Sequence, residues 1–141
     1  RIITERRAGR PKEPSQVVDA DGLLALQEMV HRIFLPDAIS DHISASVSLT
    51  HPDARDAPET VGDGVKYGSS PRGAIWLAQI SRALALIDGR PGVGFEDVRL
   101  AAPAVLGHRL ILHHAARLDG LTGRQVAEDV VETSERRVLE A

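Results

Sequence analysis

Apolar residues recur at three- and four-residue intervals along much of the chain, which is the spacing of one face of an α-helix. This spacing predicts long helices over residues 17–35, 36–50 and 71–88, and shorter ones over 95–102 and 121–131. Pro36 and Pro52 follow the first two, and a proline favours a helix end before it. We therefore predict an all-α fold, a small bundle of four to five helices.

The first of these helices shows the pattern clearly. Its apolar positions are Leu23, Leu26, Val30 and Ile33. Asp19 or Asp21 can cap its start, because a short acidic side chain accepts a hydrogen bond from the free N–H groups of the first turn. We expect this apolar face to be buried in the bundle.

The helix over 71–88 is the most hydrophobic, and we expect it to lie at the centre of the bundle. Its expected core-facing stripe contains Leu77, Ile80, Leu84 and Ile87. Ser81 and Arg82 mark a narrow polar side, which we expect to face solvent. A helix with so wide an apolar surface should pack against several neighbours.

The start of this central helix carries an unusual charge. Ser70 can cap it, Pro71 suits its first position and Arg72 lies in its first turn. The N-terminus of a helix is locally positive and favours acidic residues, so an added arginine makes a place where an anion can bind. The spacing alone leaves two readings open, an anion site or a solvated surface arginine.

Residues 51–68 show no periodicity and are rich in Pro, Asp and Gly, so we expect a long loop. Lys66 lies among glycines there, but the G-x-x-x-x-G-K-[ST] order of a phosphate-binding loop is absent from the whole sequence. Nothing in the chain is therefore expected to bind and hydrolyse a nucleotide alone.

The last third of the chain reads less regularly. Pro103 is expected to interrupt the helix that begins at Phe95, and residues 108–112 are expected to be extended or bent. Thr122 can cap the last helix. The charged residues beyond Ser134 are expected to fray.

Composition agrees with a helical protein. The 141 residues are 43% hydrophobic but include only two Phe, one Trp and one Tyr, so the core must consist mainly of aliphatic residues. No apolar run approaches the length of a membrane span and no signal segment is visible, so we expect a cytoplasmic protein with no membrane partner. The chain begins without Met, which is compatible with a piece of a longer protein.

Several kinds of chemistry find little support. A net charge of −3 with mixed signs gives no electrostatic case for nucleic acid, and the basic residues 1–14 contain no aromatic side chain to stack on bases. The absence of cysteine excludes disulfides and thiolate metal sites. His108, His113 and His114 lack the H-E-x-x-H arrangement, and G-x-S-x-G is missing, so we expect neither a metal site nor a hydrolase triad.

A set of motifs carries a family resemblance. Gly68-Ser69-Ser70-Pro71-Arg72-Gly73, Gly89-Arg90, Phe95-Glu96-Asp97-Val98 and Ala101 to Leu110 occur in this order. Together with residues 23–30 and His51-Pro52, they resemble the C-terminal lid of a MoxR-type AAA+ ATPase over roughly residues 17–130. The family usually has Ala where this chain has Ser69 and Gly73, and a capping Thr or Ser where it has Gly94.

The resemblance implies a function for the start of the central helix. It implies that Arg72 is the sensor 2 arginine, which approaches the γ-phosphate of ATP, and that Ser69 and Ser70 lie beside the nucleotide. ATP and Mg2+ would be held by an ATPase core in cis or in trans, and not by this chain alone. The resemblance also implies a homo-oligomeric ring, chaperone activity and a possible partner with a von Willebrand factor A domain.

The predicted organisation has three parts. Residues 1–16 form a basic linker or the end of a preceding ATPase core, residues 17–133 the helical lid, and residues 134–141 a charged tail. Two alternatives stay open: a free-standing helical protein-interaction module, and the lid of a magnesium-chelatase-type ATPase.

Overall fold

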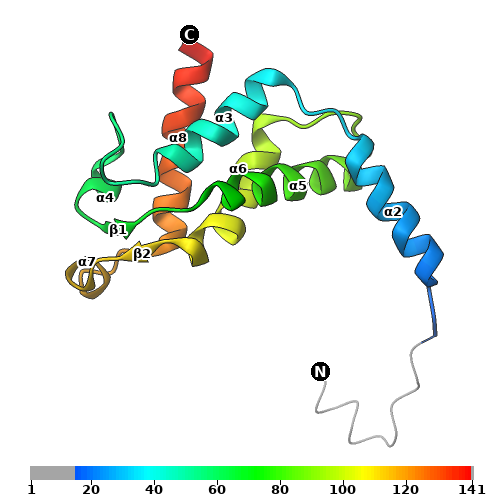
Figure 1. Cartoon of the computed structure of the whole chain (residues 1–141), viewed down its shortest axis with the longest axis horizontal. Helices are drawn as coiled ribbons and strands as arrows, with labels where there is room; N and C mark the ends of the chain where they lie inside the picture. The colour runs from blue at the N-terminus through cyan, green and yellow to red at the C-terminus, as the bar shows by residue number, and fades with distance from the viewer. Residues whose placement is uncertain (1–14, 141) are drawn as a thin grey trace, which may run out of the picture.

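The computed structural model of the protein describes residues 15–140 and confirms the all-α prediction (Figure 1). The helices are α2 (Ala20–Arg32), α3 (Asp37–Ser48), α4 (Glu59–Gly62), α5 (Pro71–Ile87), α6 (Phe95–Leu106), α7 (His114–Leu118) and α8 (Gly123–Glu140). A 3-10 turn, η1 (Gly107–Arg109), follows α6, and the strands are β1 (Val65–Tyr67) and β2 (Ile111–Leu112). The basic segment predicted over residues 1–16 lies almost entirely outside the described residues.

The core lies between α3, α5, α6 and α8, with α6 packed against both α5 and α8, and α3 against α8 and α5. Its buried hydrophobic side chains are all aliphatic, as composition predicts, and several polar side chains are buried among them. The aliphatic ones include Val61, Val65, Leu77, Val98, Leu106, Val126, Val130 and Val131. Aliphatic side chains of moderate size allow helices to pack closely, so this small bundle needs few aromatic residues.

The prediction for α5 is wrong in its orientation. Its buried positions are Gly73, Leu77, Ser81 and Ala85, which follow one another at four-residue intervals. Ser81, expected on the solvent side, is fully buried, whereas Ile80 and Ile87 of the expected core stripe are exposed. Because most of the buried positions carry small side chains, neighbouring helices can approach α5 closely along that stripe.

The first helix also differs from the prediction. Asp19 caps α2 by accepting a hydrogen bond from the Gly22 amide at 2.8 Å, as expected. However, α2 has no buried residue, and it extends away from the bundle at one end of the molecule (Figure 1). Its apolar side chains Leu23 and Leu26 are 51% and 48% exposed. Helix α2 contacts α5, but no neighbour among the described residues buries its apolar face.

The segment expected to be a long loop contains structure. It includes the short helix α4 and the strand β1, and β1 pairs antiparallel with β2, with Val65 opposite Leu112. The extended reading of residues 108–112 is thus confirmed at 111–112, while 107–109 form a 3-10 turn. A two-residue strand has no readable period, and its partner lies more than forty residues away in the chain, so this pairing is a tertiary effect.

Two further expectations about helix ends are wrong. Pro103 lies inside α6, which continues to Leu106. Helix α8 continues to Glu140 instead of fraying after Ser134, because Ser134 is fully buried and Glu135 is paired with Arg99 of α6. The expected cap Thr122 is confirmed, since its hydroxyl accepts a hydrogen bond from the Gln125 amide at 3.3 Å.

Arg90 connects the end of α5 to the start of α6. Its guanidinium donates to Asp97 at 2.8 Å and to Asp88 at 2.9 Å, and Asp97 also accepts from the Gly94 amide. Gly94 precedes α6 as an N-cap residue without a capping side chain: the Asp97 carboxylate accepts from the Gly94 amide, and the Asp97 amide donates to the Gly94 carbonyl at 3.2 Å. The hydrogen bond from Arg90 holds the pKa of the Asp97 carboxyl below its usual value of 3.8.

Candidate functional site

The Arg72 side chain lies on the surface, at the N-terminus of α5. Ser70 is the N-cap residue with an extended backbone, Pro71 is the first helical residue, and the Ser70 hydroxyl makes no capping hydrogen bond. Ser70 and Arg72 are both exposed. Among the described residues 15–140, Arg72 has no ion-pair partner and its guanidinium donates no hydrogen bond. The geometry leaves this cation available to an external anion.

Ser69, which the sequence placed beside Arg72 in the candidate site, faces the interior. It is 1% exposed, and its amide donates to the Thr50 hydroxyl at 2.9 Å. Its own hydroxyl lies so close to Gly73 that a Cβ added there would clash with it. The structure brings Ser70 and Arg72 together at the surface, and Ser69 beneath them.

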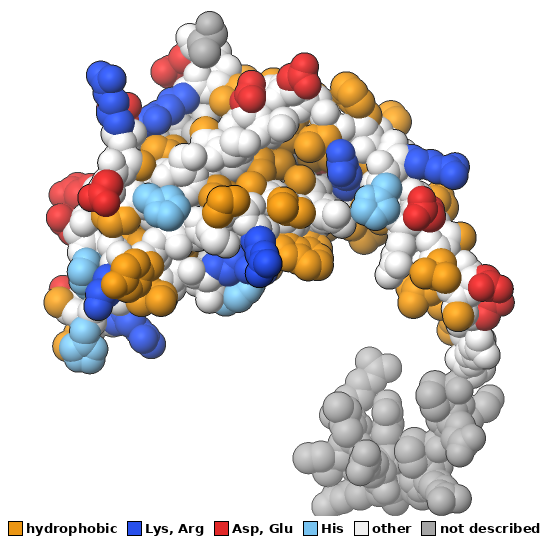
Figure 2. All heavy atoms as spheres, viewed as in Figure 1, with side chains coloured by type: hydrophobic (Ala, Val, Ile, Leu, Met, Phe, Trp, Pro, Cys, Tyr) orange, Lys and Arg blue, Asp and Glu red, His pale blue; other side chains and the backbone are white. Residues whose placement is uncertain are grey.

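The outward face of α5 continues from Arg72 as an apolar stripe. Trp76, Ile80 and Ile87 are 51%, 39% and 80% exposed, and they lie on the same side of the helix as Arg72, four, eight and fifteen residues after it. Figure 2 shows apolar side chains at the surface along the middle of the molecule, where α5 lies in the same view. Contiguous exposed apolar side chains of this kind mark interaction surfaces.

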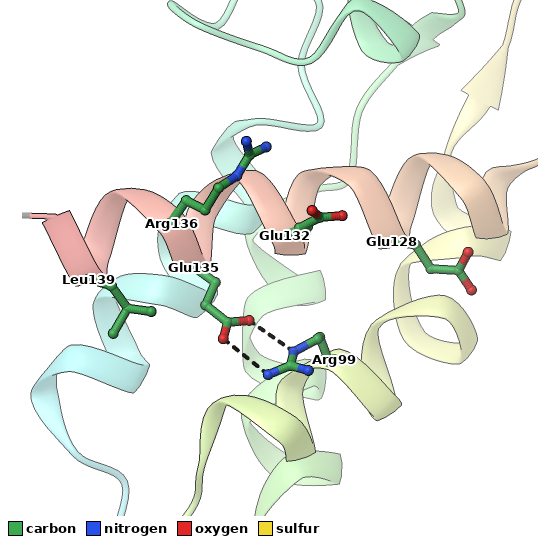
Figure 3. Close-up of a pocket in the computed structure, with 6 residues that line it drawn as sticks. All are labelled: Arg99, Glu128, Glu132, Glu135, Arg136 and Leu139. Atoms are coloured by element: carbon green, nitrogen blue, oxygen red, sulfur yellow. Dashed lines mark hydrogen bonds and ion pairs between the residues drawn. The ribbon is translucent and has the colours of Figure 1, made fainter.

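A surface groove of about 540 Å³ lies elsewhere, between α6 and α8 (Figure 3). Its lining is charged except for Leu139, and two of the lining residues, Arg99 and Glu135, point toward one another and form two hydrogen bonds of 2.9 and 3.1 Å. The pair satisfies both charges, and none of the residues expected in the site lines the groove. The groove therefore adds nothing to the site at Arg72.

The histidines noted in the sequence are separated by their local structure. His108 donates from Nδ1 to the Ala104 carbonyl at 2.9 Å, whereas His113 and His114 lie at the start of α7. Within residues 15–140, no group of three or more His, Asp or Glu side chains is placed to hold a metal ion. In the same part of the chain, no helix combines the length and apolar character needed to cross a membrane.

One histidine that sequence reasoning missed is buried in the bundle. His42 of α3 is fully buried beside Phe95, and its Nδ1 lies 3.0 Å from the Ser134 hydroxyl. That hydroxyl donates to the His42 carbonyl, so Nδ1 must carry a proton and donate to Ser134. Burial lowers the pKa of His42 below 6.5, and the Nε2 atom has no hydrogen-bond partner among the described residues.

The comparisons with known proteins agree with the fold. Residues 59–133 match the family model described as the AAA lid domain. Chaperone MoxR1 of Mycobacterium tuberculosis is 32% identical over 133 residues, which are 94% of this chain and 35% of that protein. An uncharacterised protein of Bacillus subtilis, YeaC, is 29% identical over 92% of this chain and 38% of its own length.

A solved structure supports the same assignment. The crystal structure of a candidate ATPase from Cytophaga hutchinsonii superposes with a TM-score of 0.81 at 25% identity, over 93% of this chain and 41% of that one. The chain thus spans between about a third and two fifths of the length of the relatives it matches. The chain belongs to the AAA lid domain family, and its resemblance to the lid of MoxR-type AAA+ ATPases is confirmed.

Proposed function

We propose that this domain is the lid of a MoxR-like AAA+ chaperone ATPase and that Arg72 is its sensor 2 arginine. The observation that carries the proposal is the exposed guanidinium of Arg72 in the first turn of α5, with no partner among the described residues. A guanidinium donates in a planar fork that matches phosphate oxygens, and the helix N-terminus adds to its positive potential. Ser70 lies beside it, and its hydroxyl has no hydrogen-bond partner among residues 15–140.

The nucleotide in this proposal is held by another domain. The chain contains no phosphate-binding loop, so ATP and its Mg2+ are bound by an ATPase core, in cis or in trans, and Arg72 reaches the γ-phosphate from outside. The apolar stripe of Trp76, Ile80 and Ile87 supports this arrangement, because a docked core would cover it while Arg72 points at the phosphate. Assembly into a ring, a cytoplasmic location and a partner with a von Willebrand factor A domain belong to the same proposal.

The test uses the full-length protein that contains the ATPase core. Arg72→Ala is expected to lower ATP turnover at least about tenfold, because arginines that stabilise phosphoryl transfer contribute large factors to the rate. Arg72→Lys keeps the positive charge but lacks the planar set of guanidinium donors, so its ATP turnover should lie between that of Arg72→Ala and that of the wild type. The melting temperature of the isolated domain should stay nearly unchanged, since Arg72 is exposed.

Arg124→Ala is the matched control, because Arg124 is also an exposed arginine in the first turn of a helix, α8. It should leave turnover unchanged. If Arg72→Ala and Arg124→Ala both turn over ATP at the wild-type rate, the sensor role is refuted.

The exposed apolar faces of α2 and α5 also favour the second candidate, a free-standing protein-interaction module. The two candidates differ in what the reading frame before Arg1 encodes. A Walker A motif there supports the ATPase lid, and its absence from a complete gene supports the interaction module.

A further inference from the structure

The N-terminus of α5 is fastened to the end of α3 by two consecutive residues, Thr50 and His51. The amide of Ser69 donates to Thr50 Oγ1 at 2.9 Å, and the Thr50 hydroxyl donates to the Val47 carbonyl at 2.6 Å. The Thr50 hydroxyl has one proton, which it donates to the Val47 carbonyl, so its oxygen can only accept from the Ser69 amide. Thr50 is fully buried, so water does not compete for these bonds.

His51 holds the other polar group of the same residue. Its Nε2 lies 3.0 Å from the Ser69 carbonyl, and since a carbonyl only accepts, Nε2 carries the proton and donates. The N–H and C=O groups of Ser69 are thus both bound by neighbours nineteen and eighteen positions earlier in the chain. Because both backbone polar groups of Ser69 are hydrogen-bonded, the orientation of the peptide groups on either side of it is restricted.

Close packing reinforces these two hydrogen bonds. A Cβ added at Gly68 would lie 2.7 Å from the Thr50 carbonyl oxygen, so only glycine permits the two segments to approach this closely. On the other side of Ser69, Pro71 restricts its own φ angle and the conformation of Ser70. Little backbone freedom remains between Ser69 and Arg72.

We propose that Thr50 and His51 are positioning residues for Arg72: they orient the Ser69 peptide, and through it the first turn of α5, so that the guanidinium meets the nucleotide phosphate. This inference rests on the proposed function of Arg72. Neither residue touches the nucleotide. Because catalysis of phosphoryl transfer depends on the placement of charged groups, a small rotation of this turn lowers the rate without removing the arginine.

The test measures ATP turnover in the full-length protein. His51→Ala is the first variant, because His51 is exposed and its replacement does not open the core. It is expected to lower kcat about fivefold or more, with a smaller change in KM for ATP, since a misplaced group costs transition-state stabilisation. His51→Gln, which can donate from its amide to the Ser69 carbonyl, should recover part of the loss.

Thr50→Val is the second variant, since it keeps the shape of the side chain and removes the hydroxyl, and Thr50→Ser should restore the wild-type rate. His108→Ala is the matched control. It removes an exposed histidine that also donates to a backbone carbonyl, but far from α5 in the chain, and should leave turnover unchanged.

The decisive measurement repeats both substitutions in the Arg72→Ala background. If Thr50 and His51 act through Arg72, they change turnover there by less than about twofold, because coupled residues are not additive. An equal loss in both backgrounds, or no loss in the wild-type background, would overturn the positioning role. A normal rate for Arg72→Ala itself would instead refute the proposed function.

Discussion

Helices α2 and α8 are both amphipathic, yet the fold treats them in opposite ways. Helix α8 buries five residues, Val126, Ala127, Val130, Val131 and Ser134, whereas α2 buries none. Helix α8 crosses the bundle, whereas α2 extends from one end of it (Figure 1). The comparison teaches that an apolar stripe predicts a helix and an interaction, but does not say whether the partner belongs to the same fold.

The largest expected effect contrasts two leucines, one from each environment. Leu106→Ala, at a fully buried position of α6 beside Gly73 of α5, should lower the free energy of unfolding by about 2–5 kcal/mol, because it removes buried area and leaves a cavity. Leu26→Ala on α2 should lower it by less than about 0.5 kcal/mol. Chemical denaturation of both variants measures the difference, and similar losses would mean that α2 is buried in solution.

A smaller effect is expected at the buried stripe of α5. Gly73→Ala places a methyl group on the Ser69 hydroxyl and should cost about 1–3 kcal/mol by overpacking. In a Ser69→Ala background the same substitution should cost less, because the closest contact is removed and the nearest remaining atom is Leu106 Cδ2 at 3.2 Å. Gly62→Ala, where a Cβ meets nothing within 4 Å, is the control. Additive effects of Ser69→Ala and Gly73→Ala would show that the Ser69 hydroxyl and a methyl group at residue 73 do not compete for the same space.

The smallest expected effect concerns pH. The pKa of His42 is lowered below 6.5 in the folded state, so the unfolded state binds more protons as the pH falls through 6.5. The stabilisation from neutral His42 is therefore present above pH 6.5 and is lost progressively below it. Melting temperatures should fall between pH 7.5 and pH 5, and His42→Gln should show a flatter profile. An unchanged slope would assign the pH dependence to other groups.

Much of the fold was predictable from residue spacing. The starts of α2, α5 and α8 are marked by Asp19, Pro71 and Thr122, which are local signals that act through one turn of backbone. The β1–β2 pairing and the continuation of α8 to Glu140 were not predictable, because each depends on contacts with segments distant in the chain.

The candidate site divides in the same way. Arg72 and Ser70 were identified from the Ser-Pro-Arg order, and the structure places both at the surface. His51-Pro52 was noted only as part of the family resemblance, and the contact of Thr50 and His51 with Ser69 was missed, because residue spacing does not show which distant backbone groups a helix end will meet. Only the folded chain brings Thr50 and His51 into contact with Ser69.

The sequence by itself determined that this protein is helical, where its main helices lie, and which family it resembles, because helix signals and motifs are local. Only the tertiary structure decided which face of each helix is inside. Leu77 with the small residues Gly73, Ser81 and Ala85 lets neighbouring helices approach α5, and this close packing turns Trp76 and Ile80 outward. The sequence shows which face of a helix is the most apolar, but the buried face is the one whose side chains pack closely against the neighbouring helices.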